Sequence, residues 1–90
     1  MSGTGANDEL INALKVLIIE ECDKDIEADE LDTDETLIGG PLELDSLDAL
    51  QICMSVMDNY GVRIEGGPEA RAALQSVRTL AETIAAETSA

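Results

Sequence analysis

The sequence predicts an all-α fold: a bundle of four helices with a long loop between the first two and a short third helix. Ninety residues are enough for one small domain. Aromatic residues make up 1% of the chain although 44% of it is hydrophobic, so aliphatic side chains, Met and Cys must form the core. Apolar residues recur three or four positions apart, as in amphipathic helices. We assign residues 7–88 to a single domain and residues 1–6 to a flexible N-terminal segment.

The first helix is expected to begin at a cap provided by Asn7 or Asp8 and to end near Cys22. Its apolar residues have helical spacing: Leu10, Ile11, Leu14, Leu17 and Ile18. Residues 23–45 then make a connection that is longer than usual. We expect this loop to be ordered only if its isolated apolar residues dock on the core: Ile26, Leu31, Leu37, Ile38, Leu42 and Leu44. A turn is predicted at Gly39, Gly40 and Pro41.

The second helix is predicted over Ser46–Tyr60, with Asn59 and Gly61 as its stop signal. One apolar stripe is expected to face the core: Ala49, Ile52, Cys53, Val56 and Tyr60. A second apolar stripe is rotated away from the first: Leu47, Leu50, Met54 and Met57. The remaining side is expected to be solvated: Asp48, Gln51, Ser55, Asp58 and Asn59. The second apolar stripe either packs under the loop or the third helix, or it contacts a partner protein.

The last third of the chain is expected to hold two more helices. Pro68 can open a short helix over residues 69–74. Ser76 is a candidate cap for the last helix, which has one apolar face: Val77, Leu80, Ala81, Ile84 and Ala85. Only residues 62–64 suggest a strand, and one strand cannot make a sheet.

The net charge of −15 restricts the classes of partner. It opposes binding to nucleic acid and to anionic membranes, and it favours a basic protein partner and a monomeric state. No segment approaches the roughly 20 apolar residues of a membrane span, and the N-terminus does not resemble a secretory signal, so we expect a cytoplasmic protein without membrane insertion. Cys22 and Cys53 lack metal-site or redox spacing, so both are interpreted as small hydrophobic residues, and no metal site is predicted.

Ser46 stands at the start of the second helix in a chain that has no histidine. A serine nucleophile needs a base and donors for the developing negative charge, so catalysis by Ser46 alone is not expected and the chain is not interpreted as an enzyme. Asp45 or Ser46 can simply cap the helix. A phosphate ester on Ser46 would also be stabilised there by free backbone N–H groups, so Ser46 could instead be a substrate for modification.

The order of these features resembles the acyl carrier protein family. The similarity lies in "LELDSLDAL" at the start of the second helix, the apolar pattern up to Tyr60, "GVRI", a short third helix and "SVRTLAETIAA". It covers residues 8–87 and implies a four-helix carrier. By this resemblance, Ser46 receives phosphopantetheine from coenzyme A through a magnesium-dependent phosphopantetheinyl transferase. The thiol of the arm then holds acyl groups as thioesters for partner enzymes.

The resemblance also implies roles for the neighbours of Ser46. Asp45 and Leu47 would help to present the serine to the transferase. The implied partner face consists of Leu47, Asp48, Leu50, Gln51, Met54, Met57 and Asp58. Its partners would be an acyl ligase or acyltransferase, a ketosynthase and other acyl-processing enzymes with basic surfaces. Common fatty-acid carriers have acids where this chain has Gln51 and Met57, so the chain looks more like a carrier of a specialised pathway, such as polyketide or aryl-polyene synthesis.

Two other function classes are open at this point. A calcium-binding regulator is suggested by Asp32, Asp34, Thr36 and Glu43 at EF-hand spacing, but Leu37 stands where that loop requires glycine. A loose divalent-cation module is the weaker form of the same idea. The other class is an acidic helical adaptor, in which the second helix binds a groove and Ser46 is only a cap.

Overall fold

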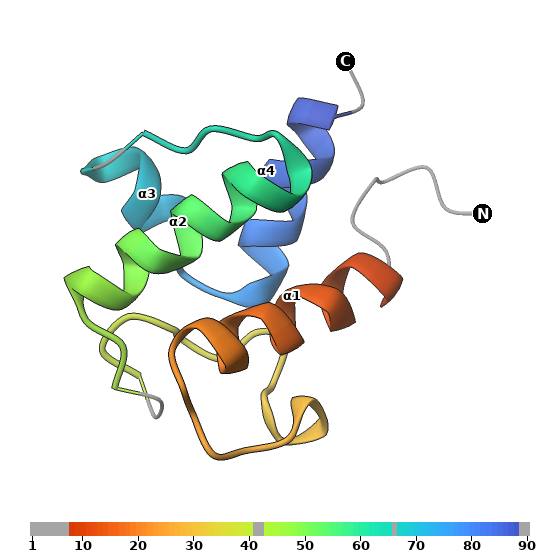
Figure 1. The fold of residues 1–90 in the computed structure, drawn as a ribbon, viewed down its shortest axis with the longest axis vertical. Coiled ribbons are helices and arrows are strands. Elements are labelled where there is room, and N and C mark those ends of the chain that lie inside the picture. The colour runs from red at the N-terminus through yellow and green to blue at the C-terminus, as the bar shows by residue number, and fades with distance from the viewer. Residues whose placement is uncertain (1–7, 41–42, 66, 89–90) are drawn as a thin grey trace.

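The structure, a computed structural model, describes residues 8–40, 43–65 and 67–88 and is all-α (Figure 1). Its elements are α1 (Asp8–Glu21), the 3₁₀ helix η1 (Ala28–Glu30), α2 (Ser46–Tyr60), α3 (Pro68–Ala73) and α4 (Val77–Thr88). Within the described residues, β pairing is limited to an isolated bridge between Ile38 and Leu44. The predicted fold class is therefore confirmed. Residues 1–6 and the candidate cap Asn7 lie outside the described residues.

The core forms where α1 packs against both α2 and α4. The short helix α3 packs on α4 (Figure 1). The predicted apolar faces of the helices supply the fully buried side chains at the centre: Leu14, Ile18, Ile52, Val56, Val77 and Leu80. Helical spacing thus identified the inner face of each long helix correctly.

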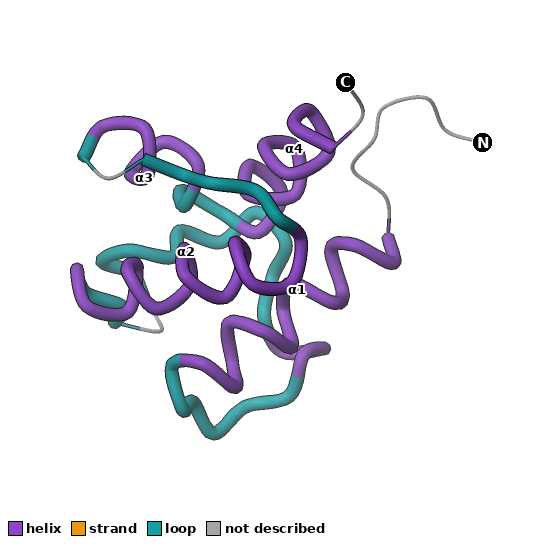
Figure 2. Tube along the Cα trace, turned by 45° about the horizontal axis from the view of Figure 1, so that its top comes forward, coloured by secondary structure: helices purple, strands orange, loops and turns teal. Residues whose placement is uncertain are grey.

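The long loop between α1 and α2 is drawn in teal in Figure 2, and its apolar side chains pack on this core. Leu31 and Leu37 are completely buried and Leu44 is nearly so, while Ile26 and Ile38 pack at the edge of the core. The loop also bonds to the junction of α3 and α4, since the Leu37 amide donates to the Gln75 carbonyl at 3.0 Å. The expected docking of the loop is confirmed at these positions, and Leu42 and Pro41 lie outside the described residues.

The helix ends match the expected signals to within one residue. α2 has the predicted bounds, and Gly61 closes it in the left-handed conformation with its N–H donating to the Met57 carbonyl at 2.9 Å. α1 ends at Glu21, one residue before Cys22, and α3 starts at Pro68 itself and ends at Ala73. Ser76 caps α4 as predicted, because its hydroxyl accepts from the Thr79 amide at 3.2 Å.

Two features differ from the expectation. Ser55 was predicted on the solvated side of α2 but is buried, because it lies about 100° around the helix from Val56, where neighbouring residues cover its short side chain. The helical turn η1 was not predicted at all. The strand-like residues Val62 and Ile64 are buried on either side of exposed Arg63, but they belong to an extended segment rather than to a strand.

Candidate functional site

Ser46 is the first residue of α2 and is exposed. Asp45 caps the helix, since its Oδ1 accepts from the Asp48 amide at 3.0 Å. In return, Oδ2 of Asp48 accepts from the Asp45 amide at 3.1 Å. These two bonds form a capping box around Ser46. Sequence alone left the cap open between Asp45 and Ser46; because Asp45 supplies it, the Ser46 hydroxyl is not used for capping.

The Asp45 carboxyl group is held in its ionised form. The hydrogen bond from the Asp48 amide is the largest cause that lowers the pKa of Asp45, and the Leu47 amide contributes in the same direction. An exposed carboxylate therefore stands directly before Ser46 at neutral pH. The chain contains no histidine, so the Ser46 hydroxyl has no imidazole beside it to act as a base.

The second apolar stripe lies open to solvent along α2. Leu47 is 71% exposed, Leu50 56%, Met54 54% and Met57 44%. The alternative in which the loop or α3 covers this stripe is therefore wrong. Four large apolar side chains side by side on one helix are unusual on a monomer surface and are typical of an interaction site. Ser46 begins the same helix, so the structure brings the serine and the stripe together.

The polar residues predicted for the partner face fall into two groups. Gln51 and Asp58 are exposed on α2 and free to meet a partner. Asp48 is half-buried, and its carboxylate already accepts the hydrogen bond from Asp45. The resemblance placed all three on the partner face, whereas the capping role of Asp48 depends on the turn before α2.

The acids of the long loop do not assemble into a cation site. Among residues 8–40, 43–65 and 67–88, no three His, Cys, Asp or Glu side chains lie close enough together to hold a metal ion. Asp34, at the third position of the EF-hand-like spacing, instead pairs with Arg78 of α4 at 2.6 Å. Oδ1 of Asp32 accepts from the Asp34 amide at 3.0 Å, which is a turn contact. These observations do not support the calcium-regulator interpretation.

The two cysteines are free thiols. Cys22 is buried in the core, as predicted, whereas Cys53 is only partly buried against it. Burial is the main cause that raises the pKa of Cys22 to about 11, and the negative charge of the Asp48 carboxylate raises it further. Burial also raises the pKa of Cys53. Both thiols are therefore protonated and poorly nucleophilic at neutral pH.

Two of the grooves that the described residues form are open to solvent, and neither of these includes Ser46. The larger, about 480 Å³, lies between α1 and the last turn of α2 and is lined by Ala13, Val16, Leu17, Glu20, Glu21, Asn59 and Tyr60. The other, about 410 Å³, lies between α3 and α4. Neither groove was predicted from the sequence, because each depends on how two helices pack. The candidate site is thus an exposed helix start with an apolar stripe, not a pocket.

Comparisons with family models, with curated proteins and with solved structures found no match to this chain. In the described part of the chain, no helix has both the length and the apolar character needed to cross a membrane. The functional interpretation therefore rests on the motif around Ser46 and on the geometry of α2.

Proposed function

We propose that this chain is an acyl carrier protein in which Ser46 carries phosphopantetheine. The observation that supports this most is the exposure of Ser46 at the first position of α2, between an ionised Asp45 and the strongly exposed Leu47. Ser46 itself need not be reactive, because the transferase supplies the base. The carrier must provide an accessible hydroxyl at a helix start whose backbone conformation is fixed. The capping box fixes that conformation.

In the loading step, the Ser46 oxygen forms a bond to the phosphorus of coenzyme A that bears the pantetheine arm. The pyrophosphate bond of coenzyme A breaks and the nucleotide leaves. The serine proton goes to a base of the transferase, and magnesium bound by that enzyme neutralises the phosphates. The thiol at the end of the arm supplies the chemistry of thioester formation. The chain's own contribution is to place Ser46, with the Asp45 carboxylate beside it.

The partner face of this carrier is the second apolar stripe with its flanking polar residues. The exposed aliphatic and Met side chains would enter an apolar depression on a partner, and Asp58 would steer a basic rim. Such partners are the transferase, an acyl ligase or acyltransferase, and a ketosynthase. Gln51 and Met57 make the face less acidic than that of common fatty-acid carriers, which favours a specialised acyl, polyketide or aryl-polyene pathway.

Intact-protein mass spectrometry tests the proposal. The apo protein is incubated with coenzyme A, magnesium and a broad-specificity phosphopantetheinyl transferase, and Ser46→Ala is treated in the same way. Ser55→Ala is the matched control, because Ser55 lies on the same helix but is buried. One phosphopantetheine adduct in the wild type and in Ser55→Ala, and none in Ser46→Ala, is the expected result. A folded wild-type protein that gains no adduct would contradict the proposal.

A second candidate function, an acidic helical adaptor, is favoured by the exposure of the second apolar stripe alone. In that case the stripe binds a partner and Ser46 has no chemical role. The variant Ser46→Ala separates the two functions, since an adaptor keeps its binding and a carrier loses all acyl loading. Met54→Asp would weaken partner binding in both cases.

A further inference from the structure

The larger groove, between α1 and the last turn of α2, changes from apolar to acidic along α1. The α1 residues that line it follow the helical period: Ala13, Val16, Leu17, Glu20 and Glu21. Residues four positions apart lie on one face about 5.4 Å apart along the axis, so Glu20 follows Val16 and Glu21 follows Leu17. Val16 is also an exposed large hydrophobic residue outside the second apolar stripe. A ligand lying along α1 would therefore meet aliphatic side chains and, one turn later, two carboxylates.

The carboxylates at the acidic end of the groove have no cation to balance them. Glu20 and Glu21 are exposed in the last turn of α1, at the negative end of the helix dipole, where basic residues are favoured. That turn contains no basic residue. Lys24 follows shortly after the helix, but within the described part of the chain neither glutamate forms an ion pair with it or with any other residue. A cation bound here would interact favourably with both carboxylates and with the end of α1.

The rest of the groove suits an organic cation better than a metal ion. Tyr60, half-buried against the core, lines the α2 side and supplies an aromatic ring, which attracts cations. Among the residues that the structure describes, no three His, Cys, Asp or Glu side chains are grouped to hold a metal. The groove measures about 480 Å³, which is ample for a long side chain and its neighbours.

We propose that this groove binds a basic segment of a partner protein, with the stem of a Lys or Arg side chain along Val16 and its charged end at Glu20 and Glu21. The four-carbon stem of lysine is about as long as one helical turn, the spacing between the aliphatic and acidic parts of the groove. Such side chains commonly lay their stems on apolar surface and keep the charge at its edge. The net charge of −15 draws a basic partner toward the chain.

This inference goes beyond the proposed function and does not depend on it. Ser46 and Tyr60 are the first and last residues of α2, so about 21 Å of helix separates them. A partner segment can therefore occupy the groove whether or not Ser46 is modified. The tests use the apo protein and no loading reaction, so failure of loading leaves this proposal standing, and failure of binding leaves the carrier function standing.

Titrations of the apo protein, followed through amide chemical shifts by NMR, test the proposal with three probes. They are a capped leucine–lysine–leucine tripeptide, the same peptide with uncharged norleucine in place of lysine, and spermidine. The lysine peptide should shift the amides of residues 13–21 and 59–60 in a saturable way, and the norleucine peptide should bind about fivefold more weakly. Equal binding of the two peptides would overturn the proposal. Tighter binding of spermidine than of the lysine peptide would assign the groove to free polyamines and overturn the partner segment.

The acidic end is tested by the double variant Glu20→Gln, Glu21→Gln, which keeps the size of both side chains. Its Kd for the lysine peptide should rise about fivefold at low ionic strength. The matched control is Glu9→Gln, Glu87→Gln, which removes two exposed acids that do not line the groove and should leave the Kd within about twofold. Equal losses in the two double variants would mean that only net charge attracts the peptide, and the groove would not be its site.

The apolar part is tested by Val16→Ser, which leaves the buried core unchanged because Val16 is exposed. The Kd for the lysine peptide should rise about threefold, since the peptide loses apolar contact. Leu47→Ala is the control, because Leu47 belongs to the second apolar stripe, and it should have no effect. If Leu47→Ala weakens binding as much as Val16→Ser does, the peptide binds the stripe and the proposal is wrong. Circular dichroism checks that each variant keeps its helices.

Thermal unfolding without any probe tests whether the acidic end is uncompensated. Removing two negative charges from the negative end of α1 should raise the thermal midpoint of Glu20→Gln, Glu21→Gln by about 3 °C. The control Glu9→Gln, Glu87→Gln should not gain in this way, because Glu9 lies in the first turn of α1, where an acid is favourable. A lowered midpoint in Glu20→Gln, Glu21→Gln would mean that the chain itself already balances these carboxylates, and would overturn the proposal.

Discussion

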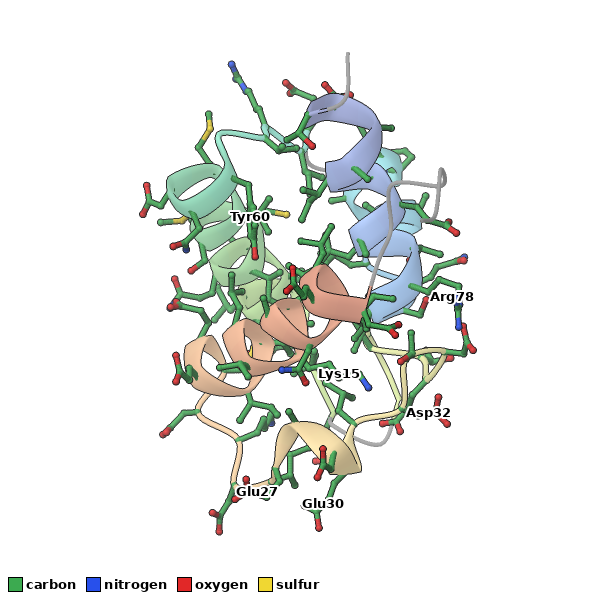
Figure 3. The ribbon with its side chains drawn as sticks, turned by 90° about the vertical axis from the view of Figure 1, so that its right-hand side faces the viewer. Lys15, Glu27, Glu30, Asp32, Tyr60 and Arg78 are labelled. Carbon is green, nitrogen blue, oxygen red and sulfur yellow. The ribbon has the colours of Figure 1, made fainter. Side chains whose placement is uncertain are left out.

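Arg78 joins α4 to the long loop through Asp34, which lies 44 positions earlier in the sequence. Figure 3 shows Arg78 at the side of α4 nearest to the loop segment that carries Asp32. Nε of Arg78 donates to Oδ1 of Asp34 at 2.6 Å, and Nη2 lies 3.3 Å from Oδ2. The backbone amide of Arg78 donates to the Thr33 carbonyl at 3.1 Å. One residue thus holds the loop through both its side chain and its backbone, near the point where Leu37 bonds to Gln75.

The Arg78 pair should make part of the stability depend on acid pH. Arg78 lowers the pKa of Asp34 below its ordinary value of 3.8, mainly through the side-chain hydrogen bond. A lowered pKa in the folded state gives stability that is present above pH 3.8 and is lost as the pH falls through the folded pKa. Asp34→Asn should therefore lower the thermal midpoint slightly at pH 7 and not at pH 2. Because both side chains are largely exposed, the difference should shrink in 1 M salt. A salt-independent difference would contradict this assignment.

The buried leucines of the loop should stabilise the fold as strongly as those of the helices. Leu31 and Leu37 are fully buried, so Leu31→Ala and Leu37→Ala should each reduce the free energy of unfolding by about 2–5 kcal/mol. Leu47→Ala is the matched control, because Leu47 is 71% exposed, and it should have little effect. Urea unfolding followed by circular dichroism measures all three. A loss below about 1 kcal/mol for both loop variants would mean that the loop is not part of the core.

Thr79 should be important for the start of α4. Its Oγ1 accepts from the Ser76 amide at 3.0 Å and lies 2.8 Å from the Ala73 carbonyl, so it connects the end of α3 to the cap of α4. Thr79→Val leaves the Ser76 amide without this acceptor and should reduce the free energy of unfolding by about 1–3 kcal/mol. Thr83→Val serves as the control, since the Thr83 hydroxyl donates to the Thr79 carbonyl within the same helix. Equal losses of unfolding free energy in the two variants would show that the contacts of Thr79 at the start of α4 add no more stability than a hydrogen bond within the helix.

Alkaline pH should destabilise the protein through Cys22. Its pKa is raised from 9.0 to about 11, first by burial and then by Asp48. A raised pKa in the folded state means that the thiol's contribution is complete below pH 9 and is lost as the pH rises to about 11. The difference in free energy of unfolding between the wild type and Cys22→Ala should therefore shrink over this interval. Cys53→Ala, measured in parallel, accounts for the other thiol. A difference that is constant from pH 8 to pH 11 would rule out this role of Cys22.

The fold was predictable where it depends on local pattern. The spacing of Leu14 and Ile18, the bounds of α2 and the cap at Ser76 all follow from residues close together in sequence, and the structure agrees. The burial of Ser55 was missed because it depends on how far the covered arc of α2 extends around the helix. The turn η1 was missed because three residues with no apolar periodicity give no helical signal.

The candidate site was predictable only in part. The exposed Ser46 and the second apolar stripe came from the motif and the helical period. The Arg78 pair joins α4 to the loop across 44 positions of the sequence. Contacts of this kind depend on the packing of helices, which no local pattern encodes.

The second apolar stripe has a consequence for the behaviour of the protein in solution. At neutral pH, electrostatic repulsion due to the charge of −15 keeps copies of the chain apart, even though the second apolar stripe is exposed to solvent. Near the isoelectric point of about 4.1 that repulsion disappears while the stripe stays exposed. Copies should then adhere through α2, so the colloidal stability of the protein is set by its acids rather than by coverage of its apolar surface.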